Sequence, residues 1–235
     1  MPLKNIRPLH ILWQETLDIG QLDGAIAGAE CALSSAGVSK EIKLKYMGQR
    51  RQPDWLSQNG IVLNPYQSLD WHIETARKYS DHTGYLNGAT LLDSLRDNPS
   101  QETDPRYELV ILKKPIHSGN HSKIFGLGRK GQGAIISLDS HLSLLQAKPD
   151  ESAEAKEKRL FNFWLSTKLN AMHELGHVFG LFPGNSAQTE LERERAHCLN
   201  KCVMYWQEYG DLYEKIANQP FCPSCLEKLK KYFSE

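Results

Sequence analysis

The chain has 235 residues, enough to bury a full hydrophobic core, and we expect one domain built as two subdomains around a cleft. Its 28 basic and 28 acidic residues balance to a formal charge of zero, which indicates neither a nucleic-acid nor an anionic-membrane partner. No stretch approaches the roughly 18 apolar residues of a transmembrane helix, and residues 1–13 lack the apolar core of a signal peptide. We therefore expect a cytoplasmic protein with no membrane partner, while its oligomeric state stays open.

Strands and helices alternate along the first part of the chain. In order, the patterns predict a strand over 9–13, a helix over 21–36 ending at Gly37, a strand over 41–47, an irregular segment over 48–66, helical pieces over 69–79 and 87–96, a polar surface loop over 98–105, and strands over 107–113, 123–127 and 133–138. The last two strands are joined by a glycine-rich segment, 128–133. This alternation is typical of the α/β class, so we expect a mixed, mostly parallel twisted sheet packed with helices.

Two histidines lie just before those strands. His117 and His121 are four residues apart, but Pro115 and the Ser-Gly-Asn sequence between them disfavour a helix. We expect them to be loop residues near the cleft rather than metal ligands.

A long helix is predicted before residue 180. Residues 159–172 contain neither Gly nor Pro. A core-facing stripe steps by three and four residues through Leu165, Leu169, Met172, Leu175 and Phe179. Gly180, followed by Phe182-Pro183-Gly184, then favours an end to the helix.

The end of this helix carries a pattern typical of zinc binding. His173 and His177 are four residues apart, so they lie on one face and can share one cation. Glu174 is rotated by about 100°, which aims its carboxylate at metal-bound water. Such a carboxylate can take the proton of that water as it attacks a carbonyl. The alternative is a buried helix with two incidental histidines.

Four of the five cysteines form two close pairs, Cys198 with Cys202 and Cys222 with Cys225. In a reduced protein this arrangement predicts a four-cysteine zinc site, with disulfides or free thiols as the alternatives. The ion would tie the segment carrying His197 and Met204 to the C-terminal helix. Cys31, in an apolar helical pattern, is most simply a core residue.

Together these motifs resemble a known family. His173-Glu174-Leu175-Gly176-His177 followed by Gly180 resembles the metzincin clan of zinc peptidases. One branch, the archaemetzincins, continues with His-Cys, Cys-x-Met and Cys-x-x-Cys. This chain has those elements in order, as His197-Cys198, Cys202-Val203-Met204 and Cys222-Pro-Ser-Cys225. The resemblance covers about residues 107–230.

The resemblance implies a zinc metallopeptidase with two Zn²⁺ ions and a peptide or protein substrate. His173 and His177 would be ligands of the catalytic zinc, Glu174 the general base, and Met204 the Met-turn residue beneath the metal. Cys198, Cys202, Cys222 and Cys225 would hold the structural zinc.

The family also implies a division of the chain. Residues 1–180 would form an α/β subdomain ending in the active-site helix, and residues 181–235 a small subdomain with the Met-turn and the cysteine site. The segment 123–138 resembles the antiparallel edge strand that borders the cleft and pairs with an extended peptide.

One ligand departs from the family pattern. The third histidine is expected at position 183, where Pro183 stands, and His197 comes fourteen residues later. An insertion over 183–196 explains this spacing, since lengthening a surface loop costs only about 0.6 kcal/mol per doubling. We expect His197 to be the third zinc ligand. The alternatives are a carboxylate from Glu190, Glu192 or Glu194, or a two-histidine site in an inactive zinc-binding scaffold of the same fold.

Overall fold

The computed structural model describes residues 3–48, 68–97, 100–119, 121–182, 197–205, 216 and 218–234. The predicted insertion at 183–196 lies outside the described residues, as does nearly all of the irregular segment at 48–66.

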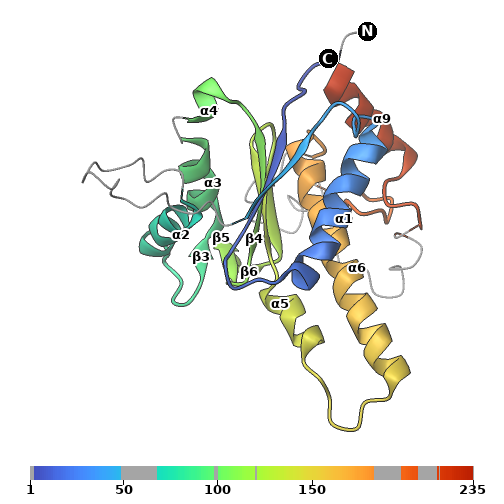
Figure 1. Ribbon diagram of the computed structural model, residues 1–235. Coiled ribbons are helices and arrows are strands. Elements are labelled where there is room, and N and C mark those ends of the chain that lie inside the picture. The colour runs from blue at the N-terminus through green and yellow to red at the C-terminus, as the bar shows by residue number, and fades with distance from the viewer. Residues whose placement is uncertain are drawn as a thin grey trace.

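A five-stranded sheet forms the centre of the molecule (Figure 1). Its strands lie in the order β2 (Leu44–Gly48), β1 (Leu9–Trp13), β4 (Tyr107–Leu112), β8 (Gly133–Ser137) and β7 (Gly126–Arg129). The first four pair in parallel, and β7 joins β8 as an antiparallel hairpin at the edge. The predicted class, a mixed and mostly parallel sheet packed with helices, is confirmed.

Helices cover both faces of this sheet (Figure 1). One face packs on α1 (Ile19–Ala36), α6 (Ala153–Val178) and α9 (Pro223–Ser234), and the other on α2 (Leu69–Lys78) and α3 (Gly88–Arg96). Because side chains alternate along a strand, β4 serves both layers. Leu109 and Ile111 enter the first core, and Val110 and Leu112 the second.

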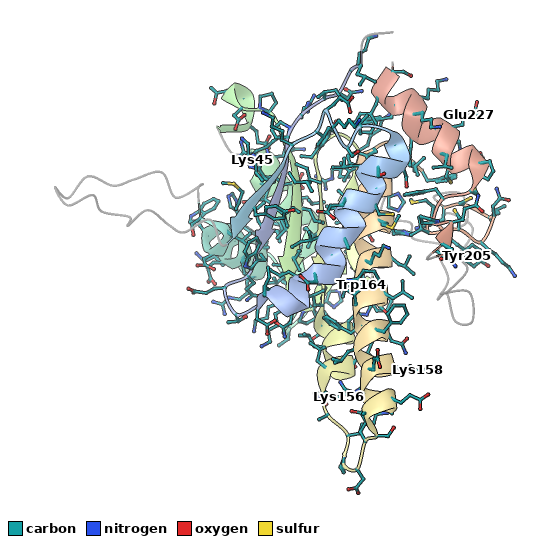
Figure 2. All side chains as sticks on the ribbon, turned by 45° about the vertical axis from the view of Figure 1, so that its right-hand side comes forward. Lys45, Lys156, Lys158, Trp164, Tyr205 and Glu227 are labelled. Atoms are coloured by element: carbon teal, nitrogen blue, oxygen red, sulfur yellow. The ribbon has the colours of Figure 1, made fainter. Side chains whose placement is uncertain are left out.

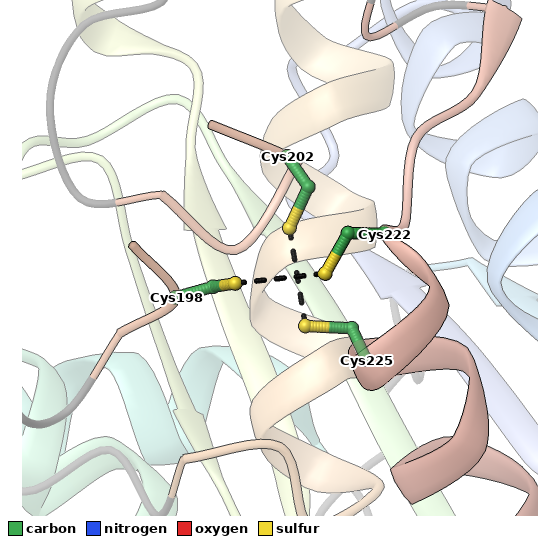
Figure 3. Close-up of side chains that lie close together, drawn as sticks. All are labelled: Cys198, Cys202, Cys222 and Cys225. Atoms are coloured by element: carbon green, nitrogen blue, oxygen red, sulfur yellow. Dashed lines mark hydrogen bonds between the residues drawn. The ribbon is translucent and has the colours of Figure 1, made fainter. Parts of the chain in front are cut away.

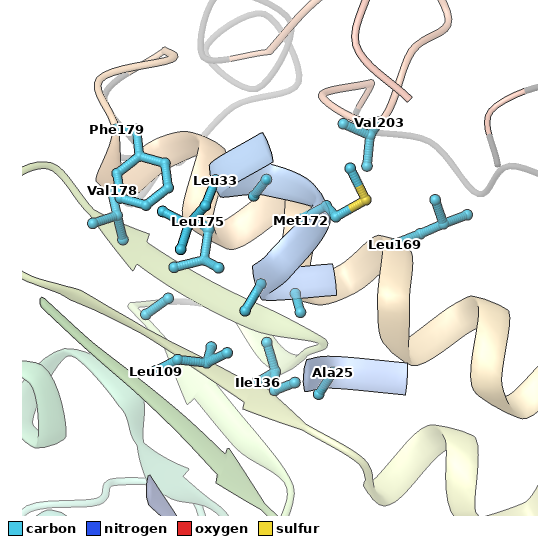
Figure 4. Packing of buried hydrophobic residues seen from close by; sticks show 14 of the residues in the cluster. Ala25, Leu33, Leu109, Ile136, Leu169, Met172, Leu175, Val178, Phe179 and Val203 are labelled. Carbon is cyan, nitrogen blue, oxygen red and sulfur yellow. The ribbon is translucent and has the colours of Figure 1, made fainter. Parts of the chain in front are cut away.

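The first core fixes α6 against the sheet. Leu175 on α6 packs among residues of α1 and the sheet, including Leu33 and Leu109 (Figure 4). The two helices approach closely at Gly28, where a Cβ would lie 2.4 Å from the carbonyl oxygen of Lys168. Glycine is therefore needed at this crossing.

The ends of α6 follow from its sequence. Its first turn is capped by Ser152, whose hydroxyl accepts a hydrogen bond from the Ala155 amide at 3.2 Å. The helix therefore begins at Ala153, before the Gly- and Pro-free stretch 159–172, and its exposed start, around Lys156 and Lys158, extends beyond the sheet (Figure 2). Gly180, with a φ of 82°, turns the chain just after the helix.

A small second sheet corrects part of the prediction. It has the order β3 (Leu86–Asn87), β5 (Ile116–Ser118) and β6 (His121–Ile124), so His117 and His121 lie on strands rather than in a loop. The predicted strand over 123–127 is divided between β6 and β7 at Phe125.

Three further short elements complete the described secondary structure. The predicted loop at 98–105 contains the helix α4 (Ser100–Thr103), and β8 is followed by α5 (Asp139–Leu142) and the 3-10 helix η2 (Ser143–Leu145).

The two ends of the chain meet beside the core. The Lys4 amide donates to the Phe233 carbonyl at 2.8 Å, and the Asn5 side-chain amide donates to the Tyr232 carbonyl at 2.7 Å.

The first core includes residues from both sides of position 180. The division of the chain into two subdomains at that position stays a prediction. Cys31 is half-buried and packs against this core. None of the helices in the described ranges is both long enough and apolar enough to cross a membrane.

Candidate metal centres

Two histidines of α6 face each other one turn apart. Nε2 of His173 lies 3.2 Å from Nε2 of His177. Their Nδ1 atoms contact backbone carbonyls, that of His173 at Val203 (2.7 Å) and that of His177 at Leu181 (2.9 Å) and Phe182 (2.5 Å). A carbonyl only accepts, so each Nδ1 carries the proton and each Nε2 presents a lone pair.

Two lone pairs directed at one another fit a shared cation. A tetrahedral zinc ion with Zn–N bonds of 2.0–2.1 Å would place its ligand nitrogens about 3.3–3.4 Å apart, close to the separation observed. Burial lowers the pKa of His173 well below its usual value and that of His177 to about 4, and neighbouring imidazoles lower both further. Both rings are therefore neutral at pH 7, as metal ligands must be.

His197 completes a group of three. Its ring centroid lies 5.2 Å from those of both His173 and His177. One ligand atom from each of the three residues falls within 4.8 Å of the others. The residues thus fit a three-histidine metal site. The alternative ligands Glu190, Glu192 and Glu194 lie outside the described residues.

Glu174 is buried beside this group, between α6 and the edge strand β7. A Cβ on Gly126 would lie 2.5 Å from Glu174 Cγ, and one on Gly128 would lie 2.2 Å from the Glu174 carbonyl oxygen. Burial raises the pKa of the Glu174 carboxyl to about 8, opposed by a hydrogen bond from the Gly128 backbone. A cation at the histidines would lower this pKa again.

Gly126 and Gly128 are site residues that the sequence analysis missed. They let β7 lie directly on the turn of α6 that carries Glu174. Two glycines at alternate positions of an apolar strand are a signal of close backbone approach, and that signal was present in the sequence.

Met204 packs beneath the same turn of α6. It is fully buried, and a Cβ on Gly176 would lie 2.4 Å from its sulfur. A larger residue at 176 would require the Met204 thioether to shift. The predicted Met-turn residue therefore lies against the helix, next to His177.

The four C-terminal cysteines converge on one point, as Figure 3 shows. Sγ of Cys198 lies 3.7 Å from that of Cys222, and Sγ of Cys202 lies 3.9 Å from that of Cys225. A disulfide bond is about 2.05 Å long, whereas tetrahedral zinc with Zn–S bonds of 2.3 Å spaces its sulfurs by about 3.8 Å. The spacing fits a zinc ion and does not fit disulfides.

The surroundings of the sulfurs favour a thiolate at Cys202, whereas burial raises the pKa of Cys198 to about 11. The Asn200 amide donates to Cys198 Sγ at 3.4 Å, and its side chain donates to Cys222 Sγ at 3.6 Å. Hydrogen bonding with Cys225 lowers the pKa of the Cys202 thiol to about 5, and the same contact raises the pKa of Cys225. One cysteine of the cluster therefore loses its proton readily, but further thiolates beside it need a bound cation to offset their negative charge.

The cysteine cluster connects the two metal centres. The Cys198 amide donates to the Met204 carbonyl at 2.9 Å, which closes the segment that carries His197. The Val203 amide donates to the Pro220 carbonyl at 2.7 Å, while the Val203 carbonyl contacts His173. The position of His197 and the tautomer of His173 thus both depend on the folding of this segment.

Known proteins resemble the chain in sequence. It is 31% identical to the archaemetzincin of Pyrococcus horikoshii over 133 residues, covering 56% of this chain and 58% of the relative. It is 36% identical to the archaemetzincin of Pyrococcus abyssi over 125 residues, covering 52% and 54%. Over these segments the chain is similar in sequence to archaemetzincins. The match spans little more than half the length of these relatives, and no family model matches the chain.

The fold is similar to that of a solved archaemetzincin. A crystal structure of archaemetzincin from Methanopyrus kandleri superimposes with a TM-score of 0.59, covering 99% of this chain and 98% of the other, at 20% identity. The likeness in fold therefore extends beyond the segment that the sequence comparison aligns. The predicted metal ligands of this chain fall into two clusters, one of three histidines and one of four cysteines.

Proposed function

We propose that the chain is a zinc-dependent metallopeptidase that hydrolyses peptide bonds. The observation that supports this best is the pair of imidazole lone pairs facing each other at 3.2 Å, with a buried carboxylate on the next residue of the helix. This is the residue set needed to hold a cation and to accept a proton from water beside it.

His173, His177 and His197 would hold the catalytic zinc, and the four cysteines a structural one. When bound, the catalytic ion supplies Lewis-acid chemistry, lowering the pKa of water towards neutrality and polarising the scissile carbonyl. The contacts to Val203, Leu181 and Phe182 keep the two helix imidazoles in the tautomer that exposes Nε2. Met204 would support the histidines from below.

Glu174 would act as the general base. Its side chain is held against Gly126, so its position is fixed before substrate arrives. The carboxylate would accept a proton from the attacking water and deliver it to the amine that leaves. Because the side chain is buried away from bulk water, that proton has few competing acceptors.

The substrate would be an extended peptide lying along β7. Among the described strands β7 pairs only with β8, which leaves its other edge for a peptide backbone. A peptide pairing there would run past Glu174, since Gly126 and Gly128 of the same strand contact that residue. Backbone pairing fixes the path of the substrate and demands little of its side chains.

Zinc counting in a His197→Ala variant tests the ligand assignment. We expect wild type to retain two zinc ions per chain after dialysis and the variant to retain one, with hydrolysis lost, because two histidines alone bind zinc weakly. Zinc is measured by mass spectrometry of the metal. Lys201→Ala, an exposed change in the same segment, should keep both ions.

The alternative function, an inactive zinc-binding scaffold of the same fold, makes a different prediction. Wild type would then hold zinc but cleave nothing. If His197→Ala retained both ions, His197 would not be a ligand and the three-histidine assignment would be wrong.

A further inference from the structure

A second group of histidines lies outside the site described above. Asp81 and His82 belong to the turn between α2 and β3, and His117 lies on β5. One ligand atom from each of the three falls within 4.8 Å of the others. The group is brought together by the pairing of β3 with β5, in which Asn87 lies opposite His117.

The distances between the Asp81 carboxylate and the two imidazoles leave room for a shared cation. Asp81 Oδ1 lies 3.4 Å from Nε2 of His117 and 3.8 Å from Nε2 of His82. Both separations exceed the usual N–H···O distance of about 2.7–3.2 Å. Ligand atoms of one tetrahedral ion with 2.0–2.1 Å bonds lie about 3.3–3.4 Å apart, which the Asp81–His117 distance matches and the Asp81–His82 distance exceeds.

The turn that carries two of these residues is ordered by its own hydrogen bonds. The Tyr85 amide donates to the His82 carbonyl at 3.2 Å, and the Leu86 amide donates to the Pro115 carbonyl at 2.9 Å. The Ser80 hydroxyl lies 3.0 Å from Nε2 of His117 and also 2.9 Å from the His82 carbonyl oxygen. The Ser80 hydroxyl can therefore donate its proton to the His82 carbonyl when Nε2 of His117 binds a cation.

Burial and access are suited to a ligand from solution. His117 is buried, with 1% of its side chain exposed, while the side chains of His82 and Asp81 are 32% and 75% exposed. Burial lowers the pKa of His117, opposed by the Asp81 carboxylate, so its ring is neutral at pH 7. A cation could reach the buried imidazole from the side where Asp81 meets solvent.

We propose that Asp81, His82 and His117 form a third metal site, which binds Zn²⁺ or another first-row divalent cation through two imidazoles and one carboxylate. With only three protein ligands and an exposed carboxylate, the site binds more weakly than the four-cysteine cluster and keeps solvent positions open. The ion holds the turn at residues 79–85 on the small sheet, whose strand β6 leads through Phe125 into β7.

The test is a zinc titration by calorimetry on the full chain without a histidine tag, after its tight sites have been filled. Wild type should take up one further equivalent of zinc. His82→Ala should lose that equivalent, and Asp81→Asn should bind it on the order of tenfold more weakly or worse. Asp104→Asn, which also removes an exposed aspartate, should match wild type.

Two results would overturn the proposal. Either wild type takes up no zinc beyond its tight sites, or His82→Ala and Asp81→Asn bind the additional ion as wild type does. Asp81 is exposed, so Asp81→Asn carries the test even if His82→Ala folds poorly. The titration does not depend on hydrolysis, so the proposed peptidase activity could fail while this site stands, or the reverse.

Discussion

In a Glu174→Gln variant we expect peptide hydrolysis to fall by roughly 100- to 10,000-fold, the range that general acid–base catalysis supplies. The amide has nearly the same shape as the carboxylate, so it keeps the contacts with Gly126 and Gly128. It cannot accept the proton of the attacking water. Zinc content and melting temperature should equal those of wild type, which separates this loss from unfolding.

Because the substrate is unidentified, the assay uses peptides from a tryptic digest of a whole proteome, with cleavage read by mass spectrometry. Glu157→Gln is the matched control, since it makes the same change on an exposed turn of the same helix. Hydrolysis at the wild-type rate by Glu174→Gln would remove Glu174 from the mechanism. Loss of a zinc ion would instead make it a ligand.

Removal of one cysteine ligand should have a larger effect on folding. In Cys222→Ser we expect the C-terminal segment to unfold and the protein to aggregate or melt far below wild type. Structural zinc contributes about 10–16 kcal/mol in small zinc domains, whereas a whole domain is stable by only about 5–15 kcal/mol. The loss should also displace His197, because the Cys198–Met204 turn positions it.

The matched control is Cys31→Ser, a half-buried cysteine outside the cluster, which should keep both zinc ions. Melting followed by circular dichroism, with and without a chelator, measures the effect. The chelator should lower the melting temperature of wild type and of Cys31→Ser but change Cys222→Ser little. A Cys222→Ser protein that melts like wild type would mean that the cysteines do not hold a structural ion.

Local sequence patterns were sufficient to predict much of this molecule. The stripe from Leu165 to Phe179 predicts the buried face of α6, and the spacing of His173 and His177 places them together on that helix. Both predictions depend on helical geometry alone, which neighbours along the chain determine. The polar first turns of α6 have no such stripe, so the pattern gave no start for the helix.

Contacts between distant segments could not be read in the same way. His117 and His121 lie on β5 and β6 but were predicted to be loop residues, because Ser and Gly lie between them and β5 pairs with β3 thirty residues earlier. Asp81, His82 and His117 likewise come together only when β3 pairs with β5. The two glycines of β7 indicate that another segment approaches this strand closely, but they do not indicate that the segment is the turn of α6 with Glu174.

The role of His197 is the central claim, and crystallography at the zinc absorption edge tests it most directly. Crystals of the zinc-loaded protein should show one anomalous peak among His173, His177 and His197 and another among the four cysteines. The peak at the histidines should lie within bonding distance of His197. A peak there whose third protein ligand is a different residue, or no peak between His173 and His177, would contradict the proposed catalytic site.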